Sequence, residues 1–223
     1  MTTRYSFFHV LVIITFTSLA GHAQPQEISK DEFHERERSA FSKLEAKLYR
    51  ERITQWTDPA MVSKEFGSMV SQICEYAPPD RQRTVSVFQM PNGTRKEETI
   101  KIGKRTFTRK DDEPWQDVSK RDPNRYSMFG DPIEAKETVT YRRVGIERIN
   151  GIEGELVEEL FYREHKVAGK SHGFGFVNRL WITKDAVLIR RELKGSGSNG
   201  LVTSHTITDY EYDPNIRIEA PIK

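Results

Sequence analysis

Histidines are the first residues of the sequence that could do chemistry, because neutral imidazoles bind transition metals. Beyond an apolar N-terminal stretch they stand at His34, His165, His172 and His205. None of these forms an HxH or HxxxH spacing with another, and no cysteine cluster accompanies them. The spacing therefore favours solvated histidines, and we expect neither a metal site nor a cofactor.

Nucleophiles and acid–base pairs are equally poorly represented. Cys74 is the only cysteine, it has no basic neighbour that would activate its thiol, and the chain has no GxSxG motif. The neighbouring carboxylates Glu158 and Glu159 would point to opposite faces of a strand, which separates them. We therefore predict a protein without enzymatic activity, in which Cys74 is a small buried residue.

Two glycine-rich stretches, residues 169–176 and 195–200, raise the question of a phosphate loop. Such loops lead into a helix whose N-terminus binds the anion, and neither stretch precedes a predicted helix. We expect both stretches to be loop tips.

The first 23 residues have the layout of a secretory signal peptide. Arg4 precedes an apolar run from Phe7 to Leu19, and small residues lead to an expected cleavage after Ala23. The run is shorter than the roughly 20 residues that span a bilayer, which disfavours the alternative of a membrane anchor. We expect a periplasmic or secreted protein without a transmembrane segment, in which residues 24–223 form a single domain.

The charge balance excludes one class of partner. The chain has 35 Lys and Arg residues against 33 Asp and Glu residues, which gives nucleic acid no electrostatic attraction. Basic residues do crowd the stretch from Arg81 to Lys110. On adjacent strands they would form a positive face for anionic lipid head groups or, because acidic residues are interleaved with them, an ordinary charged surface.

Hydrophobic periodicity indicates one helix followed by many strands. Residues 28–47 show a helical apolar stripe, and Ser29 with Glu32 has the spacing of a capping box. Period-two alternation predicts strands at 48–56, 67–76, 84–90, 98–102, 105–110, 137–149, 153–165, 176–184, 187–196 and 201–212. Prolines and a glycine make residues 118–137 a loop with at most a short helix.

These elements together predict an α+β fold. Short connections between consecutive strands favour antiparallel pairing, and a sheet of about ten strands must curl. We expect a large curved antiparallel sheet, an incomplete β-barrel, with the N-terminal helix and at most one further short helix packed across its concave face. Something must fill that concave face: the helix, side chains or a ligand.

Several stretches in this order resemble the LolA/LppX-like superfamily of periplasmic lipoprotein carriers and lipid-binding relatives. They are EYAPPDR (75–81), ETIKIGKRTFTR (98–109), VGIERINGIEGE (144–155), RLWITKDAVLIRRE (179–192) and TDYEYDPNIRIEAP (208–221). The resemblance spans most of the chain and is nearest to uncharacterised periplasmic members. It implies an incomplete β-barrel with helices across its mouth, an apolar cavity for acyl chains, and binding without chemistry.

Aromatic and aliphatic side chains are spread over nearly every predicted strand, and they are the candidates for lining such a cavity. The candidates are Phe41, Leu44, Leu48, Trp56, Tyr76, Phe88, Ile100, Phe107, Trp115, Tyr141, Phe161, Trp181 and Tyr210. Two interpretations remain open. The side chains line a pocket for a lipid, acylated molecule or other hydrophobic ligand, or they close a filled core in a module that binds an envelope protein.

Overall fold

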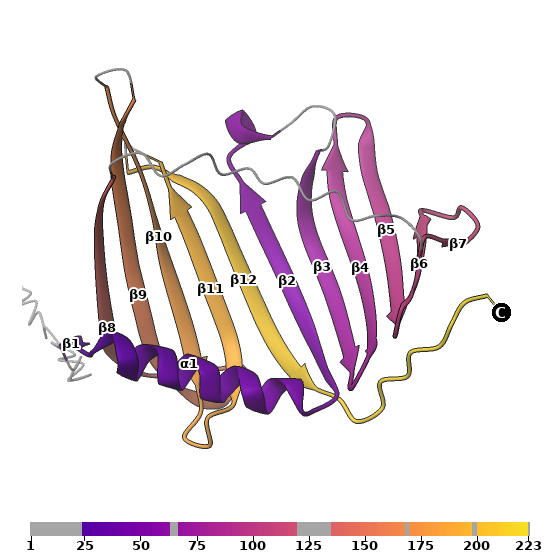
Figure 1. The fold of residues 1–223 in the computed structure, drawn as a ribbon, viewed down its shortest axis with the longest axis horizontal. Coiled ribbons are helices and arrows are strands. Elements are labelled where there is room, and N and C mark those ends of the chain that lie inside the picture. Colours follow the sequence, from indigo (N-terminus) through magenta and orange to yellow (C-terminus); the bar gives the residue numbers. More distant parts are fainter. Residues whose placement is uncertain (1–23, 63–66, 120–134, 168–169, 198–199, 223) are drawn as a thin grey trace, which may run out of the picture.

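A long helix and an extensive sheet make up the computed structural model, which describes residues 24–62, 67–119, 135–167, 170–197 and 200–222 (Figure 1). Its helical elements are α1 (Lys30–Glu45) and a 3-10 turn at Pro59–Met61. Its strands are β1 (Gln26–Glu27), β2 (Tyr49–Thr57), β3 (Ser68–Ala77), β4 (Arg81–Met90), β5 (Gly93–Ile102), β6 (Arg105–Lys110), β7 (Gln116–Asp117), β8 (Ala135–Ile149), β9 (Ile152–Val167), β10 (Lys170–Ile182), β11 (Leu188–Ser196) and β12 (Val202–Tyr212).

All strands belong to one antiparallel sheet in the order β1-β8-β9-β10-β11-β12-β2-β3-β4-β5-β6-β7. Strand β2 pairs with β12, so the first and last long strands meet in the middle of the sheet. The two-residue strands β1 and β7 lie at opposite edges and leave the sheet open, which confirms the predicted α+β half-barrel (Figure 1). No helix among the described residues is long and apolar enough to cross a membrane.

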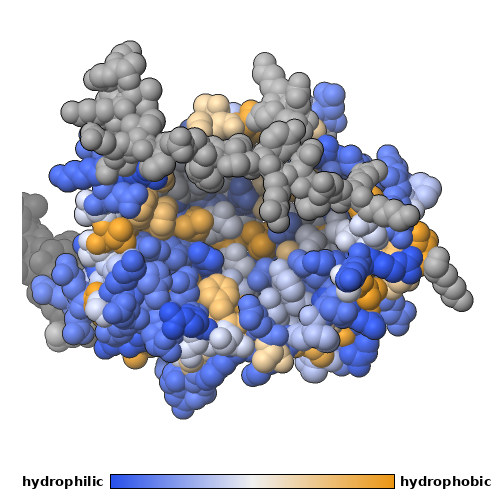
Figure 2. Space-filling model, viewed as in Figure 1, coloured by the Kyte–Doolittle hydropathy of each residue, from blue (hydrophilic) through white to orange (hydrophobic). Residues whose placement is uncertain are grey.

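Helix α1 begins as the sequence predicts and fills one end of the sheet face that it crosses. The hydroxyl of Ser29 accepts a hydrogen bond from the backbone N–H of Glu32 at 3.1 Å, which caps the helix. Phe33 and Ala40 are fully buried on the sheet side, and the opposite side of α1 is charged (Figure 2). Burial of this stripe is the main force that holds α1 on the sheet.

The strand register defines two faces of the sheet, because directly paired residues point to the same side. Val157 pairs with Leu180, and both pack under α1, so we call their side the helix face. The C-terminal segment 213–222 packs against one end of β3–β6 on the other side, which we call the tail face. There Ile216 and Ile218 are buried against a core that contains Phe107.

Residues 169–176 and 118–137 were both predicted to lie in loops. Residues 170–176 were expected in a loop tip, and that prediction is wrong, because they belong to β10. Tyr162 lies against Gly173 and Gly175, so that a Cβ at Gly173 would come within 2.3 Å of the Tyr162 hydroxyl. The glycines thus make room for an aromatic ring on the tail face. Of the expected loop at 118–137, residues 120–134 lie outside the described residues, and 135–137 begin β8.

Candidate ligand-binding site

The thirteen candidate side chains do not line a single surface. Those associated with the helix face are Phe41, Leu44, Tyr76, Phe88, Tyr141, Phe161 and Tyr210. Those on the tail face are Leu48, Trp56, Ile100, Phe107, Trp115 and Trp181. Several strands are apolar on both faces, so the alternation of the sequence did not determine which side chains share a face.

The end of the helix face that lies beneath α1 is packed. Phe41, Tyr141 and Tyr210 contact a core of fully buried side chains that includes Phe33 and Leu180. The rings of Phe33 and Tyr141 are 5.1 Å apart. This end corresponds to the filled interpretation, because helix and sheet leave these side chains in mutual contact.

Further from α1, the same face carries an exposed aromatic patch. The rings of Phe161 and Phe176 stack at 4.7 Å, and Phe174 lies 5.8 Å from Phe161. Phe174 is 43% exposed and Val139 is 39% exposed. Figure 2 shows hydrophobic side chains on this part of the surface, over β8–β10. Of the sequence candidates, Phe161 is the one that belongs to this patch.

A cluster of tyrosines surrounds the carboxylate of Glu51 in the middle of the helix face. Glu51 pairs across the strands with Tyr210 on one side and Cys74 on the other. The hydroxyl of Tyr76 donates a hydrogen bond to the Glu51 carboxylate at 3.3 Å. Burial raises the pKa of Glu51, and it also raises the pKa of the Cys74 thiol. Cys74 is only 4% exposed, which confirms the prediction that it is a buried residue and leaves it unsuited to nucleophilic chemistry.

A large cavity lies at one end of the sheet, where the β8–β9 turn, the β10–β11 turn and the end of β12 come together. These elements are at the lower end in Figure 1, where α1 also crosses. The cavity is an open cleft of about 1160 Å³, which we call the end cleft. Its lining residues are Arg52, Ile146, Arg148, Asn150, Gly151, Ile152, Glu153, Gly154, Glu155, Thr183, Lys184, Asp185, Val187, Ile189, Asp209, Tyr210, Glu211 and Tyr212.

The end cleft has an apolar wall. Val187 and Ile189 contribute from the start of β11, and Ile189 is buried with Trp181 in a small hydrophobic core. The β8–β9 hairpin adds Ile146 and Ile152, which are 75% and 50% exposed. Exposed isoleucines beside a large concave surface are typical of a binding site.

Charged side chains at the rim of the end cleft are largely paired with one another or with neighbours. The pairs are Arg52–Glu211 at 3.1 Å, Asp209–Arg190 at 2.6 Å, Arg148–Glu153 at 2.9 Å and Glu155–Arg143 at 3.0 Å. Arg36 of α1 also binds Glu155 and so ties the helix to the hairpin. The cleft thus combines an apolar wall with a rim whose charges are mutually balanced.

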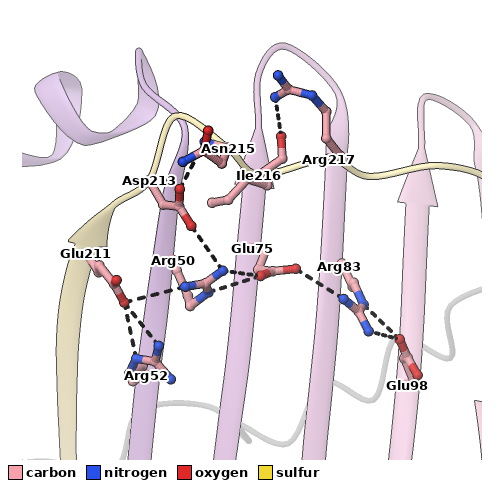
Figure 3. A network of polar contacts seen from close by, with 10 residues as sticks. All are labelled: Arg50, Arg52, Glu75, Arg83, Glu98, Glu211, Asp213, Asn215, Ile216 and Arg217. Carbon is pink, nitrogen blue, oxygen red and sulfur yellow. Dashed lines mark hydrogen bonds and ion pairs between the residues drawn. The ribbon is translucent and has the colours of Figure 1, made fainter.

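A row of alternating charges continues from this rim across the tail face (Figure 3). Arg50 binds Glu75 at 2.7 Å and Asp213 at 3.2 Å, and Arg83 bridges Glu75 to Glu98. Burial alone would raise the pKa of Glu98, but hydrogen bonds from Arg109 and Arg83 outweigh it and hold the pKa below its ordinary value. The row fastens the C-terminal segment to the sheet and has the character of a structural network.

Sequence reasoning found one residue of the end cleft, Tyr210, among its thirteen candidates. The candidates were chosen mainly as aromatic side chains along the strands, whereas the cleft is lined by strand ends and the turns between them. The available signal was the Asn150-Gly151 turn with Ile146, Ile149 and Ile152 close on both sides, since isoleucine is unusual at an exposed hairpin end.

Comparison with known proteins adds no relative to this picture. A scan of the sequence against protein-family models finds no match, and a search of curated proteins finds none either.

Proposed function

We propose that this protein is an exported, non-enzymatic binding protein that carries or senses a lipid, an acylated molecule or another hydrophobic ligand. The observation that supports this function best is the end cleft. Its volume of about 1160 Å³ is sufficient for a ligand of lipid size, and isoleucine and valine side chains form its wall. The open half-barrel and the resemblance to LolA/LppX-like carriers agree with this proposal.

The proposed location is the periplasm or the extracellular space. It rests on the signal-peptide layout of residues 1–23, which lie outside the described residues. A mature chain that begins at Gln24 after expression with the full leader would support export. A full-length chain that stays with the cell pellet would contradict it.

The binding proposal is tested first with the protein purified from its producing host. Native mass spectrometry followed by organic extraction should recover a bound hydrophobic compound. Recombinant protein stripped of ligand should then bind a fluorescent fatty acid. Failure of both measurements would remove the proposal.

The site is tested with two matched isoleucines. Ile152→Glu places a charge in the wall of the end cleft, whereas Ile73→Glu places one on the tail face outside the cleft. A half-exposed isoleucine that a ligand covers contributes about 1 kcal/mol to the free energy of binding. Ile152→Glu should therefore weaken fluorescent fatty-acid binding about fivefold. Ile73→Glu should leave binding unchanged, and equal effects of both variants would place the site elsewhere.

An alternative function is an envelope scaffold module with a filled barrel. The packed end beneath α1 favours it, because that part of the helix face has no room for a ligand. A stoichiometric protein partner captured from envelope extracts, together with the absence of any extractable lipid, would support this alternative over the carrier.

A further inference from the structure

We propose that the end cleft selects amphiphiles whose head group is zwitterionic, with one anionic and one ammonium centre, over amphiphiles with a single charge. The inference rests on the proposed function, since it concerns the chemistry of the same ligand. Two side chains carry it: Lys184 and Asp185, adjacent and opposite in charge, on the β10–β11 turn at the rim of the cleft.

Apart from Lys184 and Asp185, the charged residues of the rim are already paired. The four rim pairs already satisfy their charges within the protein, at distances of 2.6 to 3.1 Å. A head group with a single charge would attract one member of each pair and repel the other. The paired rim therefore offers no net attraction to a purely anionic or a purely cationic head group.

Two charged side chains at the rim differ from these pairs. Among the described residues, Lys184 and Asp185 are cleft-lining charges for which no side-chain ion pair is found, and both side chains are exposed. One is a cation and the other an anion. A ligand that satisfies both must bring an anion for Lys184 and a cation for Asp185, which is the pattern of a phosphate joined to an ammonium group.

The protein holds the β10–β11 turn in place. The Thr183 N–H donates to the carbonyl of Val187 at 2.9 Å, and the Ala186 N–H donates to the carbonyl of Thr183 at 2.9 Å. The ammonium group of Lys43, on α1, also donates to the backbone carbonyl of Asp185. The two charged side chains thus project from a backbone that is braced by β11 and by the helix, which lowers the entropy lost on binding.

The apolar wall begins beside the proposed head-group position. Val187 and Ile189 follow Asp185 by two and four residues, and both line the cleft. An alkyl chain attached to a head group at the turn would therefore reach the wall directly. The cleft thus offers charged side chains for the head group of an amphiphile and, beside them, an apolar wall for its alkyl chain.

The test compares three probes with the same twelve-carbon chain, each kept below its micelle-forming concentration. They are dodecylphosphocholine, dodecanoate and dodecyltrimethylammonium, and calorimetry at low salt measures their affinities. The zwitterionic probe should bind at least about threefold to fivefold more tightly than either charged probe, as expected for exposed ionic contacts. The preference should shrink at high salt because the contacts are screened.

Charge reversals provide the decisive comparison. Lys184→Glu should weaken dodecylphosphocholine and strengthen dodecyltrimethylammonium, whereas Asp185→Lys should weaken dodecylphosphocholine and strengthen dodecanoate, each by about threefold to fivefold. Lys104→Glu, which makes the same charge change on the exposed β5–β6 turn, is the control and should alter none of the three affinities.

The outcomes separate this inference from the proposed function. If the three probes bind equally well, or if both reversals leave the affinities unchanged, the zwitterion proposal is wrong while hydrophobic binding stands. If none of the probes binds and the fluorescent fatty acid does not bind either, the proposed function fails as well.

Discussion

The carboxylate of Glu98 offers the sharpest test of how this sheet is held together. Its side chain is 3% exposed, and it lies on β5 between two arginines of the neighbouring strands. Arg83 contacts one carboxylate oxygen at 2.7 Å, while Arg109 contacts the other with Nε at 3.0 Å and Nη2 at 2.6 Å. Both oxygens are therefore satisfied by charge-assisted hydrogen bonds.

Replacement of Glu98 by glutamine keeps the shape of the side chain and removes its charge. One oxygen becomes an NH₂ group that faces a guanidinium donor, so about half of the hydrogen bonding is lost. Hydrogen bonds to charged groups contribute about 1.5–3 kcal/mol each, but the arginine side chains are 40% and 34% exposed and will regain water. We expect a loss of about 2 kcal/mol in the free energy of unfolding.

The assay is thermal or denaturant unfolding of the wild-type protein and of Glu98→Gln at pH 7. For a chain of this length, 2 kcal/mol corresponds to a fall in Tm of about 4–8 °C. Glu97→Gln is the matched control, because Glu97 points to the other face and pairs at 3.3 Å with Arg95 at the surface. The control should cost less than about 0.5 kcal/mol.

The pH dependence gives the same argument a second, independent readout. The folded-state pKa of Glu98 is lowered, so its ionised form stabilises the fold above the ordinary pKa of a glutamate and this stability is lost as the pH falls through the folded-state pKa. The difference in the free energy of unfolding between the wild-type protein and Glu98→Gln should therefore become smaller as the pH falls. A difference that is absent at pH 7, or one that stays constant down to pH 2, would refute the reasoning.

Two further predictions concern the middle of the helix face and the C-terminal segment. The folded-state pKa of Glu51 is raised, so ionisation of Glu51 lowers the stability of the fold as the pH rises through that pKa. Glu51→Gln should therefore raise Tm at pH 7 and have no effect on Tm below about pH 4. An equal change in Tm at both pH values would contradict this assignment. Ile216 is 4% exposed, so Ile216→Ala should lower the free energy of unfolding by about 2–4 kcal/mol without weakening probe binding in the end cleft. Ile222 is exposed, and Ile222→Ala should lower the free energy of unfolding by less than about 0.5 kcal/mol. An unchanged Tm for Ile216→Ala would show that the C-terminal segment does not pack as described.

Much of the fold was predictable because it depends on local patterns. The cap at Ser29, the apolar stripe of α1 and the period-two strands follow from side-chain chemistry within a few residues. The turns at 78–80 and Asn150-Gly151 are dictated by proline rings and by residues that accept positive φ, as Asn150 does with φ of 50°. Short connections then leave antiparallel pairing of consecutive strands as the simplest arrangement.

The candidate site was not predictable in the same way. Lys184, Ile152 and Glu211 lie far apart in the chain, and no local pattern brings the three together. Their proximity depends on the side-by-side order of β9, β10, β11 and β12 in the sheet and on the position of the β8–β9 hairpin end.

Local sequence patterns were sufficient to predict a long antiparallel meander after one amphipathic helix, because helix caps, alternation and turn residues depend on neighbouring residues. The tertiary structure was needed to determine which face each apolar side chain occupies, since β4 and β10 carry apolar residues on both sides. It also decided that α1 fills one end of the sheet while turns enclose the end cleft at that same end. The physical reason is that burial and cavity shape arise from packing between strands distant in sequence, for which no local pattern selects a partner.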